Sequence, residues 1–136
     1  MGHWLLKSEP SVYSWSQLVK DGHTSWTGVR NPAAQLNLKA MKTGDRCFFY
    51  HSGATKEIVG IAEVVRAAFP DPTDKAGKAV TVDIKPVKPV KQPVQLSAIK
   101  ADAKFKDLKL VREGRLSVVP VGGEHWKLIL KMSGSA

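Results

Sequence analysis

The stretch RCFFYH at residues 46–51 and the stretch IVGIAEVVRAA at residues 58–68 decide the fold. Neither alternates regularly between apolar and polar side chains, which is typical of strands that are buried on both faces or curled into a barrel. The link between them, residues 52–57, is mostly polar and contains Gly53. Such a link joins neighbouring strands directly, so the sequence predicts a hairpin.

A strand and a helix are expected upstream of this hairpin. Trp4–Lys7 is a short apolar run that ends at Ser8-Glu9-Pro10. Because a residue before proline favours extended geometry, this run is predicted to be a strand that enters a loop. Ser14 can cap a helix that runs to Lys20 and stops at Gly22.

The stretch SWTGVRNPAA, which starts at Ser25, combines an aromatic ring, a flexible backbone, a cation and an amide. Pro32 fits the first position of a helix that runs to about Met41, with Asn31 as its N-cap. A helix start favours anions, and Trp26, which precedes it, could face a cleft beside it. The alternative is that Trp26 only anchors this loop in the core.

The segment that follows the hairpin is rich in proline and lysine. Residues 70–74 are predicted to form a loop without a role in a site. Ala79–Val87 alternates like a strand, but three prolines make it and its continuation an edge strand or an extended connector: Pro86, Pro89 and Pro93. Three lysines recur at every third residue, namely Lys85, Lys88 and Lys91. They could follow a phosphate backbone, but a solvated edge that deters aggregation is the interpretation that we favour.

The remaining elements complete an α+β domain. Short helical turns are predicted at residues 96–100 and 105–108, a last strand at 116–121 and an amphipathic helix at 124–132. The total is five or six strands flanked by short helices, which indicates a small curled sheet or barrel in a single domain over residues 1–136. Loops at the mouth of such a barrel form a natural pocket.

The amino-acid composition indicates which class of partner and which cellular compartment to expect. The 136 residues contain 21 Lys and Arg against 12 Asp and Glu, a net charge of +9 that suits a nucleic acid. We expect neither a membrane span nor a secretory leader. Because Cys47 is the only cysteine, we expect a reducing compartment, namely the cytoplasm. The four histidines lie far apart in the sequence, so neither a metal nor another cofactor is expected: His3, His23, His51 and His125. We also expect a monomer.

Several short motifs occur together in a fixed order over nearly the whole chain. They are KSEP (7–10), WTGVRN (26–31), GD (44–45) followed by FYHS (49–52), GIA (60–62) and LSVVPV (116–121). In this order and spacing they resemble the EVE domain family, which is similar in fold to PUA and YTH domains. The resemblance implies a PUA-like β-barrel with a pocket for one modified nucleobase. The chain departs from the family pattern at Pro32, Gln35 and Leu36, where many members carry an aromatic, a basic and an amide residue.

The resemblance also implies roles for individual residues. Trp26 would stack on the base. The edge of the base and any methyl group would be met by a larger set: Lys7, Ser8, Glu9, Pro10, Val29, Asn31, Tyr50, His51, Ser52 and Pro120. Backbone phosphates would be bound by Lys7, Arg30 and Lys39. The expected ligand is a modified pyrimidine, 5-methylcytosine or a derivative, in DNA or RNA.

Two functions of other classes remain as alternatives. Glu9, His51 and Ser52 contain an acid, a base and a nucleophile, but they follow no nucleophile-elbow or triad pattern, so we do not expect an enzyme. If the chain bound no nucleobase, Tyr50 and His51 would be ordinary core residues and Ser8 would only cap a loop. A basic protein-interaction module, whose charge serves acidic partners, is the other alternative.

Overall fold

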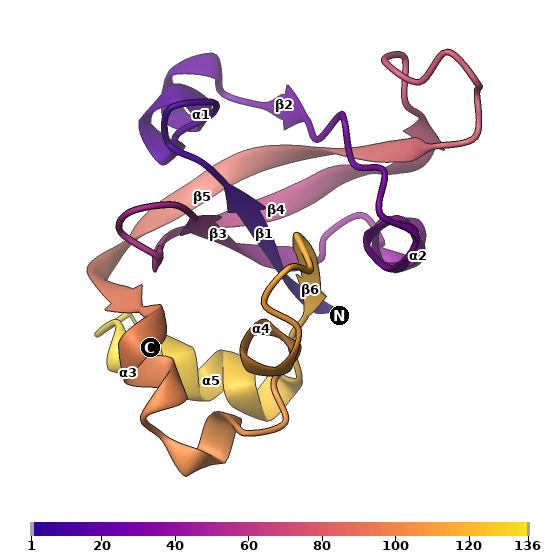
Figure 1. The fold of residues 1–136 in the computed structure, drawn as a ribbon. Coiled ribbons are helices and arrows are strands. Elements are labelled where there is room, and N and C mark those ends of the chain that lie inside the picture. Colours follow the sequence, from indigo (N-terminus) through magenta and orange to yellow (C-terminus); the bar gives the residue numbers. More distant parts are fainter. Residues whose placement is uncertain (1, 136) are drawn as a thin grey trace.

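The computed structural model describes residues 2–135, and the two ends of the expected domain, residues 1 and 136, lie outside the described part. It contains one mixed sheet with the strand order β2-β5-β4-β3-β1-β6 (Figure 1). The strands are β1 (His3–Ser8), β2 (Thr24–Ser25), β3 (Arg46–His51), β4 (Glu57–Pro70), β5 (Val80–Gln95) and β6 (Val118–Pro120). The helices are α1 (Trp15–Asp21), α2 (Pro32–Ala40), α3 (Leu96–Lys100), the 3-10 helix η1 (Ala103–Phe105), α4 (Lys109–Arg112) and α5 (Gly123–Met132). This confirms the predicted α+β class.

The β3–β4 hairpin forms the centre of the sheet, as the sequence predicts. Cys47, Phe48, Phe49 and Tyr50 of β3 are all buried. Because successive side chains of a strand point to opposite faces, β3 serves two packing layers. Phe48 stacks on Trp126 of α5 with ring centroids 3.8 Å apart. Phe49 meets the rings of two other tryptophans edge to face, Trp15 and Trp26.

Helix α2 bridges the two margins of the curled sheet. It packs against β5 and β6 (Figure 1). The Gln35 carboxamide donates to the Val80 carbonyl at 3.0 Å and accepts from the Val80 N–H at 2.8 Å, as a neighbouring strand would. Asn37 donates to the Val118 carbonyl of β6 at 2.7 Å. These side chains satisfy backbone N–H and C=O groups at the margins of the sheet, where no further strand pairs with them. In this way α2 completes the barrel-like layer.

The predicted caps of the first two helices are confirmed. The Ser14 hydroxyl accepts from the Gln17 N–H at 3.1 Å, and Gly22, with φ of 80°, ends α1. The Asn31 side chain accepts from the Ala34 N–H at 3.0 Å. Both helix starts are therefore encoded locally by a side chain that accepts from the first turn, and at α2 also by Pro32, whose ring presets φ.

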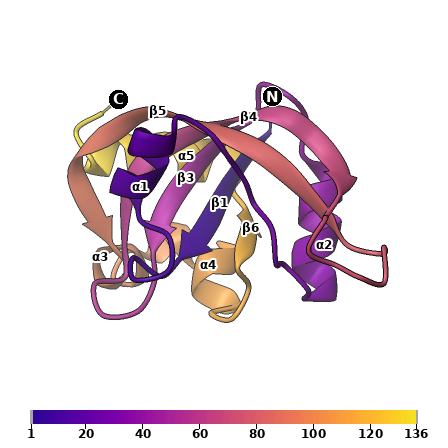
Figure 2. The same cartoon turned by 90° about the horizontal axis from the view of Figure 1, so that it is seen from above.

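The proline-rich segment is the edge strand of the two alternatives and not a connector. β5 is one strand that pairs with β4 along its length, while β2 pairs with only two residues of its other side. Its prolines are tolerated because the β4–β5 register shifts beside Pro86 and Pro89 and because β2 covers only Asp83 and Ile84 on the other side. The paired β4 and β5 curve across the sheet as one long ribbon, with α1 and α2 near its opposite ends (Figure 2). Two predictions differ by a few residues. β6 is shorter than 116–121, and the helical turn expected at 105–108 lies instead on either side of that stretch, in η1 and in α4.

Gly60 allows Trp15 to lie directly on β4. A Cβ atom at this position would be 2.6 Å from atoms of the indole ring of Trp15, which real side chains do not tolerate. We expect Gly60→Ala to lower the free energy of unfolding by about 1–3 kcal/mol, because the indole must leave its place. Urea denaturation of both proteins measures this difference. The matched control is Gly123→Ala in the first turn of α5, where a Cβ meets nothing within 4 Å and stability should not fall. Equal stability of both variants would contradict this account of Gly60.

Candidate nucleic-acid interface

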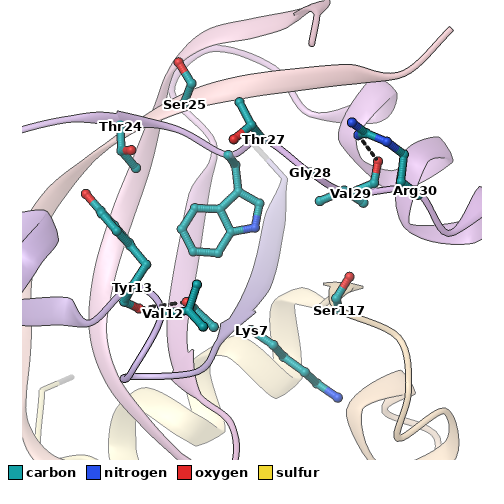
Figure 3. A pocket seen from close by; sticks show the side chains of 12 residues that line it. Lys7, Val12, Tyr13, Thr24, Ser25, Thr27, Gly28, Val29, Arg30 and Ser117 are labelled. Carbon is teal, nitrogen blue, oxygen red and sulfur yellow. Dashed lines mark hydrogen bonds between the residues drawn. The ribbon is translucent and has the colours of Figure 1, made fainter. Parts of the chain in front are cut away.

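A cavity of about 480 Å³ opens where the end of β1 faces β2 and the loop after it (Figure 3). This volume lies within the range of small-molecule sites, roughly 300–1,000 Å³. Three chain segments and one residue of the β6 approach line it: Lys7, Ser8, Val12, Tyr13, Thr24, Ser25, Trp26, Thr27, Gly28, Val29, Arg30 and Ser117. Polar and apolar groups therefore meet around a space large enough for one heterocyclic base.

Trp26 forms a rigid wall of this cavity. Its N–H donates to the Val82 carbonyl at 2.8 Å, which fixes its backbone to β5. Its ring is nearly perpendicular to those of Tyr13 and Phe49, with centroids 6.3 and 5.6 Å away. The side chain is only 9% exposed, so it anchors the loop and lines the cavity at once. Within residues 2–135 no aromatic ring stacks face to face on this indole, which leaves it available to a planar ligand.

The lip of the cavity is held by Asp71, from the loop between β4 and β5. Its carboxylate accepts from the Gly28 N–H at 2.9 Å and from Arg30 at 3.2 Å. Gly28 has φ of 85°, a conformation that suits glycine. Burial by itself raises the pKa of Asp71, but hydrogen bonds from Thr73, Gly28 and Arg30 outweigh it and lower this pKa to about 2. Asp71 is thus a buried anion that fixes the shape of the lip.

Two cations flank the cavity. Lys7 donates through Nζ to the Gly114 carbonyl at 2.8 Å and lies 5.7 Å from the centre of the Tyr50 ring. Burial, and then the nearby charge of Lys100, lower the pKa of Lys7. Arg30 is bound to Asp71 and Thr73, but its side chain remains 45% exposed. Both sites can receive an anion next to the cavity.

The family model of the EVE domain matches residues 2–132. This chain belongs to the EVE domain family. An NMR structure of a Rhodopseudomonas palustris protein shares 56% identity over 98% of this chain and 94% of that chain, with a TM-score of 0.93. The crystal structure of human THYN1, in complex with DNA containing 5-methylcytosine, shares 30% identity over 98% of both chains, with a TM-score of 0.91.

The relation of this EVE domain to YTH domains is visible in the fold. The YTH domain of Zygosaccharomyces rouxii MRB1 was solved with RNA containing N6-methyladenosine. Its match covers 97% of this chain and 86% of that chain, with a TM-score of 0.62 and 16% identity. At this identity the likeness concerns the fold alone. The expected membership, and the PUA-like fold that it implies, are therefore confirmed.

Five residues predicted for the pocket or for phosphates line the cavity of the EVE domain: Lys7, Ser8, Trp26, Val29 and Arg30. The others do not line this cavity, and several of them have structural partners. The Asn31 carboxamide caps α2, Pro120 pairs with Trp4 in the sheet, and Tyr50 is buried beneath Lys7. Lys39 is exposed in the last turn of α2. Their contacts with nucleic acid remain predictions.

Hydrogen bonds hold the loop after β1 in place. Glu9 and Pro10 are exposed, and the Glu9 carbonyl accepts from the N–H groups of Val12 and Tyr13. The Ser52 N–H donates to the Ser8 carbonyl at 2.9 Å, which ties the β3–β4 link to this loop. Ser8 in turn donates its hydroxyl to the Tyr13 carbonyl at 2.7 Å. This loop is therefore fixed at both ends.

His51 has a partner that bears on the enzyme alternative. Its Nε2 accepts from the Trp15 N–H at 3.0 Å, which places the ring proton on Nδ1. Burial lowers the pKa of His51, while Glu57 raises it by a smaller amount. Nε2 is thus committed to α1 and does not accept a proton from Ser52. Among the described residues no group of three or more His, Cys, Asp or Glu could hold a metal ion. None of the helices over residues 2–135 is long and apolar enough to cross a membrane.

Several lining residues were not assigned to the pocket from the sequence. Gly28 and Ser117 belong to the family motifs, and Ser25 and Thr27 flank Trp26 directly, so the motifs and their neighbours are the available signal. Val12, Tyr13 and Thr24 join the cavity only because the loop after β1 folds back beside β2. No local sequence pattern predicts that arrangement.

Proposed function

We propose that this EVE domain binds nucleic acid by taking one modified base into the cavity beside Trp26, and that the base is a modified pyrimidine such as 5-methylcytosine or a derivative. The observation that carries this proposal is the unstacked indole of Trp26 on the wall of a 480 Å³ cavity with cations at its edge. The human THYN1 complex with 5-methylcytosine DNA supports it, since that protein has nearly the same fold.

Stacking on Trp26 would contribute affinity but little selectivity between bases. An aromatic plate contributes roughly 1–3 kcal/mol for a stacked base of any kind. One buried methyl group adds about 0.8 kcal/mol, which corresponds to about fourfold in affinity. Apolar atoms of Val29 can contact such a methyl group, while the hydroxyls of Ser8 and Thr27 can meet polar atoms of the base edge. A preference beyond fourfold would require exclusion by shape.

In a duplex, the base must leave the stack to reach this cavity. Flipping costs a few kcal/mol, whereas a single strand avoids most of this cost. The charge of +9 and the cations Lys7 and Arg30 at the cavity favour phosphate contacts that offset part of it. We also propose that this reader is a monomer, and that its compartment is the cytoplasm because a single buried cysteine suits reducing conditions.

The test is an affinity series with matched oligonucleotides that contain either one 5-methylcytosine or plain cytosine, in DNA and RNA, single- and double-stranded. We expect the modified strand to bind about fourfold more tightly. Repetition at two salt concentrations separates phosphate binding, which weakens steeply with salt, from base selection, which does not. Equal affinity for modified and plain strands would overturn the proposal. Turnover of the modified base would favour an enzyme, and no binding to any strand a protein-interaction module.

A further inference from the structure

The loop between β1 and α1 holds an apolar side chain in solvent. Val12 is 78% exposed, more than any other large apolar residue of the described chain. Its backbone is nevertheless fixed, because the N–H groups of Val12 and Tyr13 both donate to the Glu9 carbonyl at 2.9 Å. The Ser8 hydroxyl closes the loop by donating to the Tyr13 carbonyl. A rigid backbone thus presents an aliphatic side chain that packs on almost nothing.

Val12 is also part of the cavity mouth. It lines the cavity beside Tyr13, on the side opposite Val29 and Arg30 (Figure 3). Single exposed aliphatic residues are ordinary on protein surfaces, and Val19 of α1, 53% exposed, is one of them. Val12 differs from Val19 because it lines the cavity and at the same time faces solvent.

We propose that Val12 is a wedge that enters the base stack of a double-stranded nucleic acid at the place vacated by the base in the cavity. The inference rests on the proposed function and deepens it. A base that leaves a duplex opens a gap of apolar base faces, and an aliphatic side chain that fills the gap removes those faces from water and hinders return. Lys7 and Arg30, on two sides of the cavity, are placed to bind the phosphates of the opened strand.

A duplex is favoured over a single strand by the chemistry of this side chain. A base of a flexible single strand can enter the cavity without leaving a paired gap, so an apolar residue at the mouth would have no task there. A rigid, exposed valine suits a ligand that presents apolar ring faces next to the flipped base. Val12 should therefore contribute to binding of the duplex and little to binding of the single strand.

The experiment compares Val12→Ser with Val19→Ser, both of which replace an exposed valine. Each variant is titrated with a duplex that carries one central 5-methylcytosine and with the methylated single strand alone. Because Val12 is 78% exposed, its replacement should leave the thermal unfolding midpoint unchanged, which is measured first. We expect Val12→Ser to weaken duplex binding by about tenfold and single-strand binding by less than about twofold. Val19→Ser should change neither.

The outcomes separate this inference from the proposed function. If the wild-type protein prefers the methylated strands but Val12→Ser binds the duplex as tightly as the wild type does, the wedge is wrong and the proposed function stands. An equal loss for duplex and single strand also overturns the wedge, since it makes Val12 an ordinary part of the cavity wall. If the wild-type protein shows no preference for the methylated strands, the proposed function fails and the wedge fails with it.

Discussion

Replacing Trp26 by alanine is expected to weaken binding of an oligonucleotide that contains 5-methylcytosine by about 5- to 150-fold, because a stacked base loses roughly 1–3 kcal/mol without the aromatic plate. Fluorescence anisotropy of a labelled strand measures the change. Since the indole is also packed on Tyr13 and Phe49, the variant will be less stable, and binding must be measured where circular dichroism shows the native fold.

A second variant separates stacking from packing at this position. Trp26→Phe keeps an aromatic face and most of the packing, so we expect it to retain more affinity than Trp26→Ala at the same position. A folded Trp26→Ala protein that binds as tightly as the wild type would contradict the assignment of Trp26 as the stacking wall.

Replacing Asp71 by asparagine is expected to lower both stability and affinity. Asparagine keeps the shape, but it removes the charge that Arg30, Gly28 and Thr73 share. Hydrogen bonds to a charged group contribute about 1.5–3 kcal/mol, so the free energy of unfolding should fall by about this amount. The lip of the cavity should loosen as well, because the Gly28 N–H loses its anionic acceptor. Urea denaturation and the same anisotropy titration measure the two effects.

The pH dependence of the stability lost in Asp71→Asn shows whether the charge of the carboxylate is its cause. The pKa of Asp71 is lowered to about 2 in the folded protein, against about 3.9 in an unfolded chain. A carboxyl with a depressed folded pKa stabilises fully above the unfolded value and loses this contribution as the pH falls through the folded value. The gap in stability between wild type and Asp71→Asn should therefore be constant above about pH 5 and shrink toward pH 2.

Asp107→Asn is the matched control for this charge. Asp107 is 72% exposed and, among the described residues, pairs only with Arg112, at the protein surface. Surface pairs contribute about 0–1 kcal/mol, so this variant should differ little from the wild type at any pH. A gap for Asp71→Asn that stays the same from pH 5 to pH 2 would show that the lost contribution is not that of an ionised carboxylate.

Much of the fold follows from local sequence. Ser14 and Asn31 were recognised as helix caps because the geometry of a cap involves residues only a few positions apart. The β3–β4 hairpin was recognised because two apolar runs flank a short polar link. Both features need no knowledge of distant parts of the chain.

The parts that escaped prediction depend on distant contacts. Asp71 lies in a stretch of turn-forming residues, and nothing there indicates that its carboxylate reaches Gly28, 43 positions earlier. Tyr13 and Val12 reach the cavity because of a loop whose direction is set by hydrogen bonds to Glu9 and Ser8. The prolines of β5 leave an edge strand and an extended connector open, and the pairing with β4, whose register shifts accommodate the prolines, makes it a strand. Tertiary contacts override local preference at each of these places.

The candidate site shows the same division. Trp26, Gly28 and Arg30 are close in sequence and stay together at the cavity. Asn31, next in the chain, is drawn away because it caps α2. A motif therefore located the site, but only the structure shows which of its side chains face the cavity.

The most direct measurement uses the four tryptophan indole N–H groups as reporters in a ¹H–¹⁵N correlation spectrum. The Trp26 indole N–H has no hydrogen-bond acceptor within residues 2–135, whereas that of Trp4 is buried and bound to Asp45 at 2.9 Å. We predict that a strand with 5-methylcytosine shifts the Trp26 signal, that a plain strand shifts it less at equal concentration, and that the Trp4 signal stays in place. A Trp26 signal that responds equally to both strands, or to neither, would contradict the account.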